Sequence, residues 1–183
     1  MKLLQKTQFG NPILRKKAAI VNLQKVKTIK FQQLIANMFF TMRESQGVGL
    51  AAPQINQPWQ LAVIEIQKST VRPQVNPLAP QVIINPKITR YSRKVAYDWE
   101  GCLSLDGVRG LVPRSTEITV RYYDALGKLQ VKKFTGFQAR VFQHEIDHLD
   151  GVVFVDRMID MKPLMPVSEF RKRILGKNGL KSK

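Results

Sequence analysis

Gln143-His144-Glu145-Ile146-Asp147-His148 contains both histidines of this 183-residue chain. An α-helix turns once in about 3.6 residues, so positions 144 and 148 lie on one face and their imidazoles can bind the same metal ion. Glu145 follows the first histidine and can face a water in the metal's open position. This H-E-x-x-H spacing predicts a helix that carries two nitrogen ligands and a proton-transferring carboxylate.

The spacing alone leaves an alternative open, because the same pattern occurs in helices whose histidines are only solvated or hydrogen-bonded. A catalytic metal needs a third protein ligand and an open position for water. Cys102 is the chain's single cysteine and is the obvious candidate for that ligand. The alternative for a lone cysteine is a small buried hydrophobic residue with no further role.

The sequence around the motif predicts the bounds of its helix. The helix should run from about Phe137 to Leu149 and end near Gly151. Phe142, Ile146 and Leu149 lie on one stripe, which we expect to be buried in the core.

Other segments predict an early helix and several strands. Residues 30–44 carry apolar side chains three and four positions apart, as in an amphipathic helix. Strand-like runs cover residues 61–66, 81–85 and 117–123, and a turn at 124–127 leads into a second strand of a hairpin at 128–134. Residues 50–54 should be extended, and residues 69–80, with three prolines, should form a surface loop. Strands followed by a late helix indicate an α+β fold.

Length and composition limit the classes of protein to consider. A chain of 183 residues with 44% hydrophobic residues fits one globular domain. We expect a single catalytic domain at residues 1–168, followed by a basic tail at 169–183. One cysteine cannot form an internal disulfide, which indicates a reducing compartment. No signal-peptide core or long apolar run is visible, so we expect a soluble cytoplasmic protein that does not enter membranes.

The chain is strongly basic, with 30 Lys and Arg against 13 Asp and Glu and a formal net charge of +17. Such a charge favours encounters with polyanions. The tail from Arg171 to Lys183 concentrates basic residues and is the segment we expect to contact an anionic partner such as the ribosome. The alternative is a solvated cationic end that only aids solubility. Nothing in the sequence indicates base-specific recognition of nucleic acid.

Three blocks of sequence can now be compared with a known family. They are Gly47-Val48-Gly49-Leu50-Ala51-Ala52-Pro53-Gln54, Glu100-Gly101-Cys102-Leu103-Ser104 and the block at 143–151, which continues as Leu149-Asp150-Gly151. In this order they resemble the three signature motifs of the peptide deformylases. Residues 10–15 also resemble the usual opening of that family, so the resemblance covers nearly the whole chain. It implies short antiparallel strands packed around a central helix that carries the H-E-x-x-H motif.

The resemblance implies an activity and a metal. Peptide deformylases remove the formyl group from the N-terminal formylmethionine of nascent polypeptides and release formate. They use one divalent metal, natively Fe(II) and replaceable by Ni, Co or Zn. Carried over to this chain, the metal ligands are Cys102, His144 and His148.

The chemistry also assigns expected roles to nearby residues. A divalent cation lowers the pKa of bound water from 15.7 towards ~7, and Glu145 can take that proton and pass it to the leaving amine. The tetrahedral oxyanion needs donors aimed at it in advance. By resemblance, these donors are the side-chain amide of Gln54 and the backbone N–H of Leu103.

Substrate contacts follow from the same resemblance. An extended formyl-Met peptide can add to a sheet edge through main-chain hydrogen bonds, while one pocket recognises the methionine. Arg109 is expected to hold the peptide backbone, although an ordinary surface arginine is the alternative, and Gly49 can equally be a helix-exit residue. Asp106 stands where the family usually has proline. The full expected set is Gly47, Val48, Gly49, Leu105, Arg109, Gly110, Phe137 and Val141.

Glu100 and Asp147 are acidic residues inside the motifs that we do not expect to bind the metal. The resemblance implies that Glu100 supports the motif loop through buried polar contacts. Asp147 or a neighbour can orient a metal-bound imidazole, or Asp147 can cap the helix.

Two other functions remain open from the sequence alone. The first is a zinc peptidase, which needs a further histidine or glutamate as ligand; the chain has no third histidine, and the Cys102 block would have no role. The second is a basic nucleic-acid or ribosome-binding protein that keeps the fold without activity. Intact ligands and Glu145 disfavour it.

Overall fold

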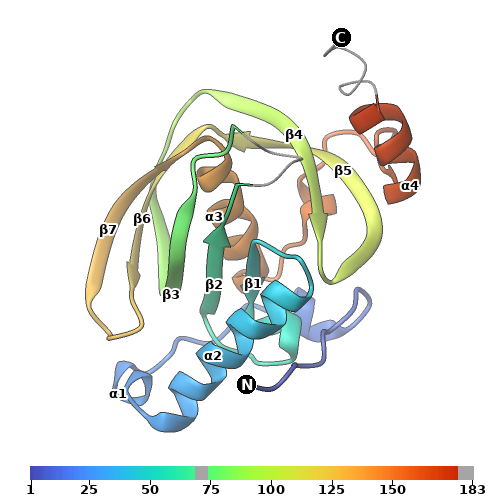
Figure 1. Ribbon diagram of the computed structural model, residues 1–183. Helices are drawn as coiled ribbons and strands as arrows, with labels where there is room; N and C mark the ends of the chain where they lie inside the picture. The colour runs from blue at the N-terminus through green and yellow to red at the C-terminus, as the bar shows by residue number, and fades with distance from the viewer. Residues whose placement is uncertain (69–73, 177–183) are drawn as a thin grey trace.

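Figure 1 shows a computed structural model of the chain, which describes residues 1–68 and 74–176. One antiparallel sheet has the strand order β1-β2-β3-β6-β7, and a smaller sheet has the order β4-β5-β8. The strands are β1 Gly49–Ala51, β2 Leu61–Ile66, β3 Leu78–Tyr91, β4 Val95–Cys102, β5 Leu105–Ser115, β6 Glu117–Tyr123, β7 Leu129–Thr135 and β8 Met165–Pro166. The α-helices are α1 Leu23–Val26, α2 Ile29–Glu44, α3 Gly136–Leu149 and α4 Val167–Phe170. Shorter helical turns cover Pro12–Arg15, Ala52–Ile55, Phe154–Arg157 and Arg171–Leu175.

The central helix is α3, which carries the H-E-x-x-H motif and packs against β1, β2, β3, β6 and β7 and also against β5. The predicted stripe of Phe142, Ile146 and Leu149 is buried, which confirms the expectation. Phe142 stacks on Phe134 of β7 with 3.8 Å between ring centroids. This apolar face fixes α3 on the sheet and leaves its opposite side to face β4 and β5.

Strand β2 is covered on both faces. Ala62 and Ile64 belong to the core cluster that includes α3, whereas Leu61 and Val63 belong to the cluster that includes α2. A strand buried on both sides reads as a continuous apolar run rather than an alternating one. Strand β1 pairs with β2 and is the edge strand of this sheet among the described residues. It therefore lies between the same two helices, and its outer edge is not paired with another described strand of the sheet.

A third cluster lies between the smaller sheet and the chain that follows α3. It contains Cys102, Leu105, Val112, Val153 and Phe154. Cys102 is the last residue of β4 and pairs with Leu105, the first residue of β5, across the tight turn between the two strands. This turn is what carries the cysteine to α3.

Most of the predicted elements are confirmed. The helix expected at 30–44 is α2, the motif helix expected from about 137 is α3, and the strand at 61–66 and the hairpin at 117–134 are present. Two expectations are wrong. Of the segment expected to be extended, residues 52–54 belong to a 3-10 turn, and the loop expected at 69–80 is wrong from residue 78, where β3 begins. The strand expected at 81–85 is confirmed as part of this longer strand. Residues 69–73 of that loop lie outside the described residues.

The described helices include none long and apolar enough to cross a membrane.

Near the C-terminus, Phe170 packs against Trp99 of β4 with 5.2 Å between ring centroids. Of the expected basic tail, residues 177–183 lie outside the described residues.

Candidate metal centre

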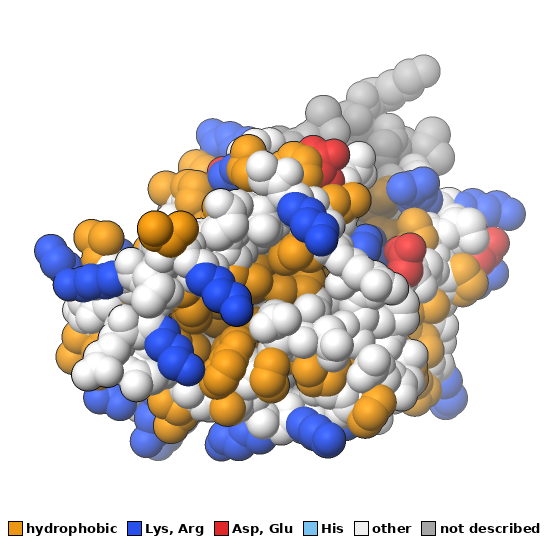
Figure 2. All heavy atoms as spheres, turned by 90° about the horizontal axis from the view of Figure 1, so that it is seen from below, with side chains coloured by type: hydrophobic (Ala, Val, Ile, Leu, Met, Phe, Trp, Pro, Cys, Tyr) orange, Lys and Arg blue, Asp and Glu red, His pale blue; other side chains and the backbone are white. Residues whose placement is uncertain are grey.

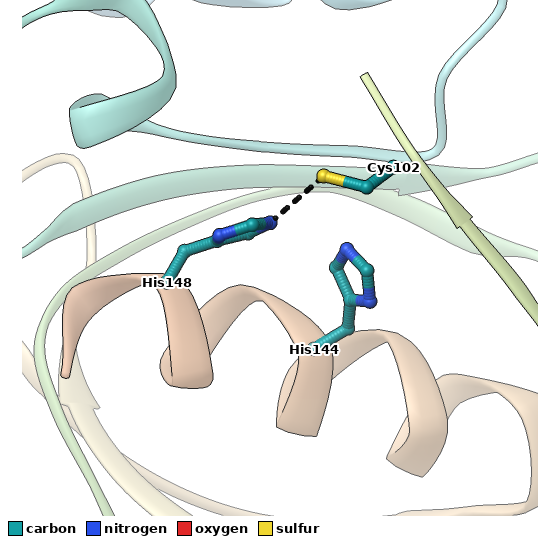
Figure 3. A group of neighbouring side chains, drawn as sticks. All are labelled: Cys102, His144 and His148. Carbon is teal, nitrogen blue, oxygen red and sulfur yellow. Dashed lines mark hydrogen bonds between the residues drawn. The ribbon is translucent and has the colours of Figure 1, made fainter. Parts of the chain in front are cut away.

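Cys102, His144 and His148 converge on one point (Figure 3). Each offers a ligand atom, and these atoms all lie within 4.8 Å of one another. The Nε2 atom of His148 is 3.2 Å from the Cys102 sulfur, and the two imidazole rings are nearly perpendicular, at 82°. Helix α3 supplies both histidines one turn apart, and the end of β4 supplies the cysteine from the opposite side.

The donor set fits a divalent transition metal. One sulfur and two imidazole nitrogens are ligands that Fe, Co, Ni and Zn accept, and three protein ligands leave a coordination position open. Cys102 is 8% exposed and His148 1% exposed, and the side chain of His144 is 12% exposed. The residues present therefore fit a divalent metal of the kind that the resemblance implies.

The electrostatic surroundings favour the ligand form of the cysteine. Burial alone would raise the pKa of the Cys102 thiol, but the imidazoles of His148 and His144 hold that pKa well below its usual range. A thiolate, rather than a thiol, is the form that binds a metal. The pKa of His144 lies well above its usual range despite burial, because Cys102 and Glu100 stabilise the charged ring.

Glu100 fixes the orientation of His144. Its Oε2 atom lies 2.9 Å from Nδ1 of the ring, which leaves Nε2 as the free ligand atom. Burial would raise the pKa of Glu100, but contacts with His144 and Arg114 hold it well below the ordinary value. Glu100 is therefore a charged group inside the protein and needs further partners.

Two arginines supply those partners. The Nε and Nη2 atoms of Arg114 each lie 3.0 Å from a different carboxylate oxygen of Glu100, and Nη1 of Arg140 lies 2.7 Å from Oε1. Arg114 also donates to Asp147, which in turn accepts from Arg157 at 2.7 Å. Asp147 thus pairs with arginines instead of orienting an imidazole.

The sequence analysis missed these arginines, although two signals for them exist. Arg140 precedes His144 by four residues and so lies on the same side of α3. Arg114 follows Gly110 and Val112 in the alternating buried positions of β5, a strand that the sequence analysis did not predict.

Glu145 is buried beside the ligands, with 4% of its surface exposed. Its Oε2 atom has no hydrogen-bond partner among the described residues. Burial raises the pKa of Glu145 to about 7, although the nearby imidazoles lower it. A Cβ atom added to Gly49 would overlap the Glu145 carboxylate, so this glycine provides the space that the carboxylate occupies.

Gln54 and Leu103 lie beside Cys102. Gln54 belongs to the 3-10 turn Ala52–Ile55 and is 2% exposed, and its Nε2 atom is 3.3 Å from the Cys102 sulfur. Leu103 follows the cysteine directly. A Cβ atom on Gly47 would lie 2.9 Å from the Leu103 side chain, so the first motif packs closely on the second.

The remaining expected substrate residues are spread around this centre. Leu105 packs in the cluster of Cys102, and the guanidinium of Arg109 lies against Gly101, the residue before the cysteine. Gly110 packs closely on Met158, because a Cβ atom added to the glycine would lie 2.5 Å from the Met158 sulfur. Val141 is buried in the main core and is 5% exposed. Val48 and Phe137 are partly buried and pack on the cluster that contains Val141.

A surface pocket lies beside the β4–β5 turn. Its lining includes Ser104, Leu105 and Asp106 from the turn and Gln8 and Phe9 from the N-terminal segment. Asp106 accepts a hydrogen bond from the backbone N–H of Gly107, whose φ of 80° suits glycine.

Comparison with known proteins gives a consistent result. The family model described as "Polypeptide deformylase" matches residues 4–164. The chain is 45% identical over 156 residues to "Peptide deformylase 2" of Nostoc sp., covering 85% of this chain and 86% of that protein. It is 46% identical over 157 residues to "Peptide deformylase" of Desulforudis audaxviator, covering 86% and 94%.

Solved structures show the same similarity. A class I type b peptide deformylase from Acinetobacter baumannii, in its Met-Ala-Ser-bound crystal structure, matches with a TM-score of 0.83 and 34% identity, over 86% of this chain and 99% of that one. The peptide deformylase from Thermotoga maritima matches with a TM-score of 0.76 and 33% identity, over 87% and 100%.

Proposed function

The chain belongs to the polypeptide deformylase family, and on that premise we propose how its residues divide the reaction among themselves. The protein is a metal-dependent hydrolase that removes the N-terminal formyl group from nascent peptides. The observation that supports our residue assignment most directly is the convergence of the Cys102, His144 and His148 ligand atoms within 4.8 Å.

In this proposal Cys102, His144 and His148 hold one divalent metal, Fe(II) in the native protein, which Ni, Co or Zn can replace. A metal bound there supplies a Lewis acid and makes a water nucleophilic at neutral pH. Glu100 keeps the His144 ring in the ligating orientation through the 2.9 Å contact to Nδ1. Burial of the three ligands keeps bulk water away from the reacting carbonyl.

Glu145 transfers the proton. It accepts a proton from the attacking water and delivers it to the amine nitrogen that leaves when the formyl carbon–nitrogen bond breaks. The support for this role is geometric: the carboxylate is buried next to the ligands, and its Oε2 atom has no partner among the described residues. A carboxylate bound to an arginine in the manner of Glu100 would not be available for this task.

The Gln54 side-chain amide and the Leu103 backbone N–H stabilise the oxyanion that develops on the formyl oxygen. Gln54 directs its Nε2 atom towards the Cys102 sulfur at 3.3 Å, so an N–H donor already points at the centre before substrate arrives. Donors placed in advance stabilise the transition state without reorganisation.

The substrate binds as an extended peptide beside β1. Strand β1 is an edge strand of its sheet among the described residues, so its outer edge can pair with a further strand. Main-chain pairing recognises no side-chain sequence, which suits an enzyme for many nascent chains. We place the formyl-Met residue and the peptide against Gly47, Val48, Gly49, Leu105, Arg109, Gly110, Phe137 and Val141.

A direct test compares a formylated methionyl tripeptide with its unformylated form. The proposal predicts formate release from the first and no cleavage of the second. A zinc peptidase would instead cut a peptide bond in either peptide and release no formate. That second pattern would overturn the proposed function.

We predict that Gly49→Ala lowers kcat/KM far more than Gly47→Ala. The new methyl group at position 49 would overlap the buried Glu145 carboxylate. The one at position 47 would meet the flexible end of Leu103 at 2.9 Å and two backbone oxygens at 3.4 Å. Displacement of a general base costs roughly 10²-fold or more in rate. Steady-state formate release checks this order, and equal activities of the two variants would show that the space at Gly49 is unimportant.

We further propose that the protein works in the cytoplasm, with residues 1–168 as its catalytic domain and residues 169–183 as a tail that contacts the ribosome. Figure 2 shows one face of the molecule on which Lys and Arg side chains are spread around a hydrophobic hollow and acidic side chains are few. Nascent substrates emerge from a polyanionic particle, which a net charge of +17 would attract. The tail carries Arg171, Lys172, Arg173, Lys177, Lys181 and Lys183, of which the last three lie outside the described residues.

Deletion of residues 171–183 should weaken cosedimentation with ribosomes, and higher salt should weaken binding of the full chain. A control in which Lys6, Lys16, Lys27, Lys30, Lys87 and Lys128 are changed to glutamine removes the same six charges elsewhere and should bind better than the truncated chain. Equal binding by the truncated and full chains would remove the tail from the proposal.

A further inference from the structure

Ser104 is a fully buried polar residue to which the reaction above gives no role. It lies in the turn between β4 and β5, two residues after Cys102, and 0% of its surface is exposed. Its backbone N–H points at the Cys102 sulfur at 3.4 Å, and its carbonyl accepts from Phe9 N at 2.7 Å. The backbone of Ser104 is thus held on both sides.

The Ser104 hydroxyl contacts Gln54. The Oγ atom lies 3.3 Å from Gln54 Nε2, and the same nitrogen lies 3.3 Å from the Cys102 sulfur. On the other side of the carboxamide, Oε1 accepts from Ala51 N at 2.8 Å. A glutamine amide carries two N–H donors, and here each of them faces a different acceptor.

These contacts allow only one orientation of the carboxamide. If the group were turned over, its oxygen would face the sulfur and the buried Ala51 N–H would lose its acceptor. An unsatisfied buried donor costs about 1–3 kcal/mol. The Ala51 N–H therefore fixes the positions of oxygen and nitrogen in the Gln54 carboxamide. The Ser104 hydroxyl fixes the directions of the two amide hydrogens.

We infer that Ser104 is a positioning residue that acts through Gln54. Its hydroxyl binds one hydrogen of the Gln54 amide. The other hydrogen faces the Cys102 sulfur and is thereby directed at the centre where the formyl oxygen must develop charge. The inference rests on the proposed role of Gln54 and adds the group that holds it in place. Without the hydroxyl, the amide can rotate away, and the donor is no longer placed in advance.

A double-mutant cycle tests this role. Ser104→Ala should lower kcat for formate release by about 3- to 10-fold with KM little changed, because the lost interaction acts on the transition state. In a Gln54→Ala background, Ser104→Ala should cause no further loss. Equal losses in both backgrounds would overturn the inference, since a merely structural effect does not depend on Gln54. Should Ser104→Ala fail to fold, Ser104→Gly goes through the same cycle.

A second readout does not depend on activity. In the 15N-labelled, zinc-loaded protein, the side-chain amide resonances of Gln54 are those absent from Gln54→Ala. Ser104→Ala should speed hydrogen exchange of one of the two amide protons, and unchanged exchange of both would contradict the inference. A failure of the Gln54 role gives a different result: Gln54→Ala itself would keep full activity.

Discussion

Glu145→Ala should lower kcat for formate release by about 10²- to 10⁴-fold while the protein keeps its metal, because this carboxylate transfers the proton and is not among the ligand atoms. Formate release and metal content, measured on the same preparation, check both halves of the prediction. Glu117→Ala is a matched control, since Glu117 pairs with Lys133 at the surface and should keep full activity.

The same substitution should leave the fold at least as stable. The Glu145 Oε2 atom is buried without a partner among the described residues, and its removal relieves that desolvation. The melting temperature of Glu145→Ala should therefore equal or exceed that of the wild type. Loss of metal together with activity would instead assign Glu145 a structural role in the site.

Arg114→Met should lower the free energy of unfolding by about 3–5 kcal/mol, the usual cost of leaving a buried charge without its partner. The Arg114 side chain is 5% exposed. Its loss would remove a charged partner from two buried carboxylates, those of Glu100 and Asp147. Denaturant unfolding at equilibrium measures the change.

Lys133→Met provides the comparison for Arg114→Met. The Lys133–Glu117 pair is 2.8 Å long, but its side chains are 60% and 40% exposed. An exposed pair contributes about 0–1 kcal/mol. If both variants lost the same small amount, the buried pairs around Glu100 would not be essential to stability.

The helix of the site was predictable from local sequence. The i and i+4 placement of His144 and His148, and the apolar stripe through Phe142, are properties of α3 alone. The approach of Cys102 was not derivable in this way. It depends on the β4–β5 turn, which carries Cys102 to α3 from 42 residues before His144 and which the sequence analysis did not predict. Cys102 was a candidate ligand there because it is the only cysteine and because it lies in a block that resembles the family.

Strand β3 shows why local signals failed elsewhere. Pro80 at its start, together with Pro73 and Pro77 before it, argued for a loop, because proline cannot donate a ladder hydrogen bond. Pro80 lies where the pairing of β3 with β2 is irregular, between the Leu78 and Gln81 pairs, and Pro86 lies where its pairing with β6 shifts, between Ile84 and Lys87. Bulges of this kind tolerate proline, but they arise from the partner strand and leave no mark in the local sequence.

The charged residues behind the metal ligands were only partly visible in the sequence. Arg140 shares a side of α3 with His144, but Glu100 and Arg114 belong to β4 and β5, two strands that the sequence analysis did not predict. Only the pairing of β4 with β5 over α3 encloses all three. The resemblance anticipated buried contacts for Glu100, but it did not identify the arginines that compensate its charge.

The most direct test of the account is the metal coordination of protein purified without oxygen, measured by elemental analysis and X-ray absorption on the wild type and on Cys102→Ser. The account predicts one divalent metal per chain with one sulfur and two imidazole donors, and loss of that sulfur signal together with formate release in Cys102→Ser. A wild-type metal with no sulfur neighbour, or a Cys102→Ser protein with unchanged coordination and activity, would contradict it.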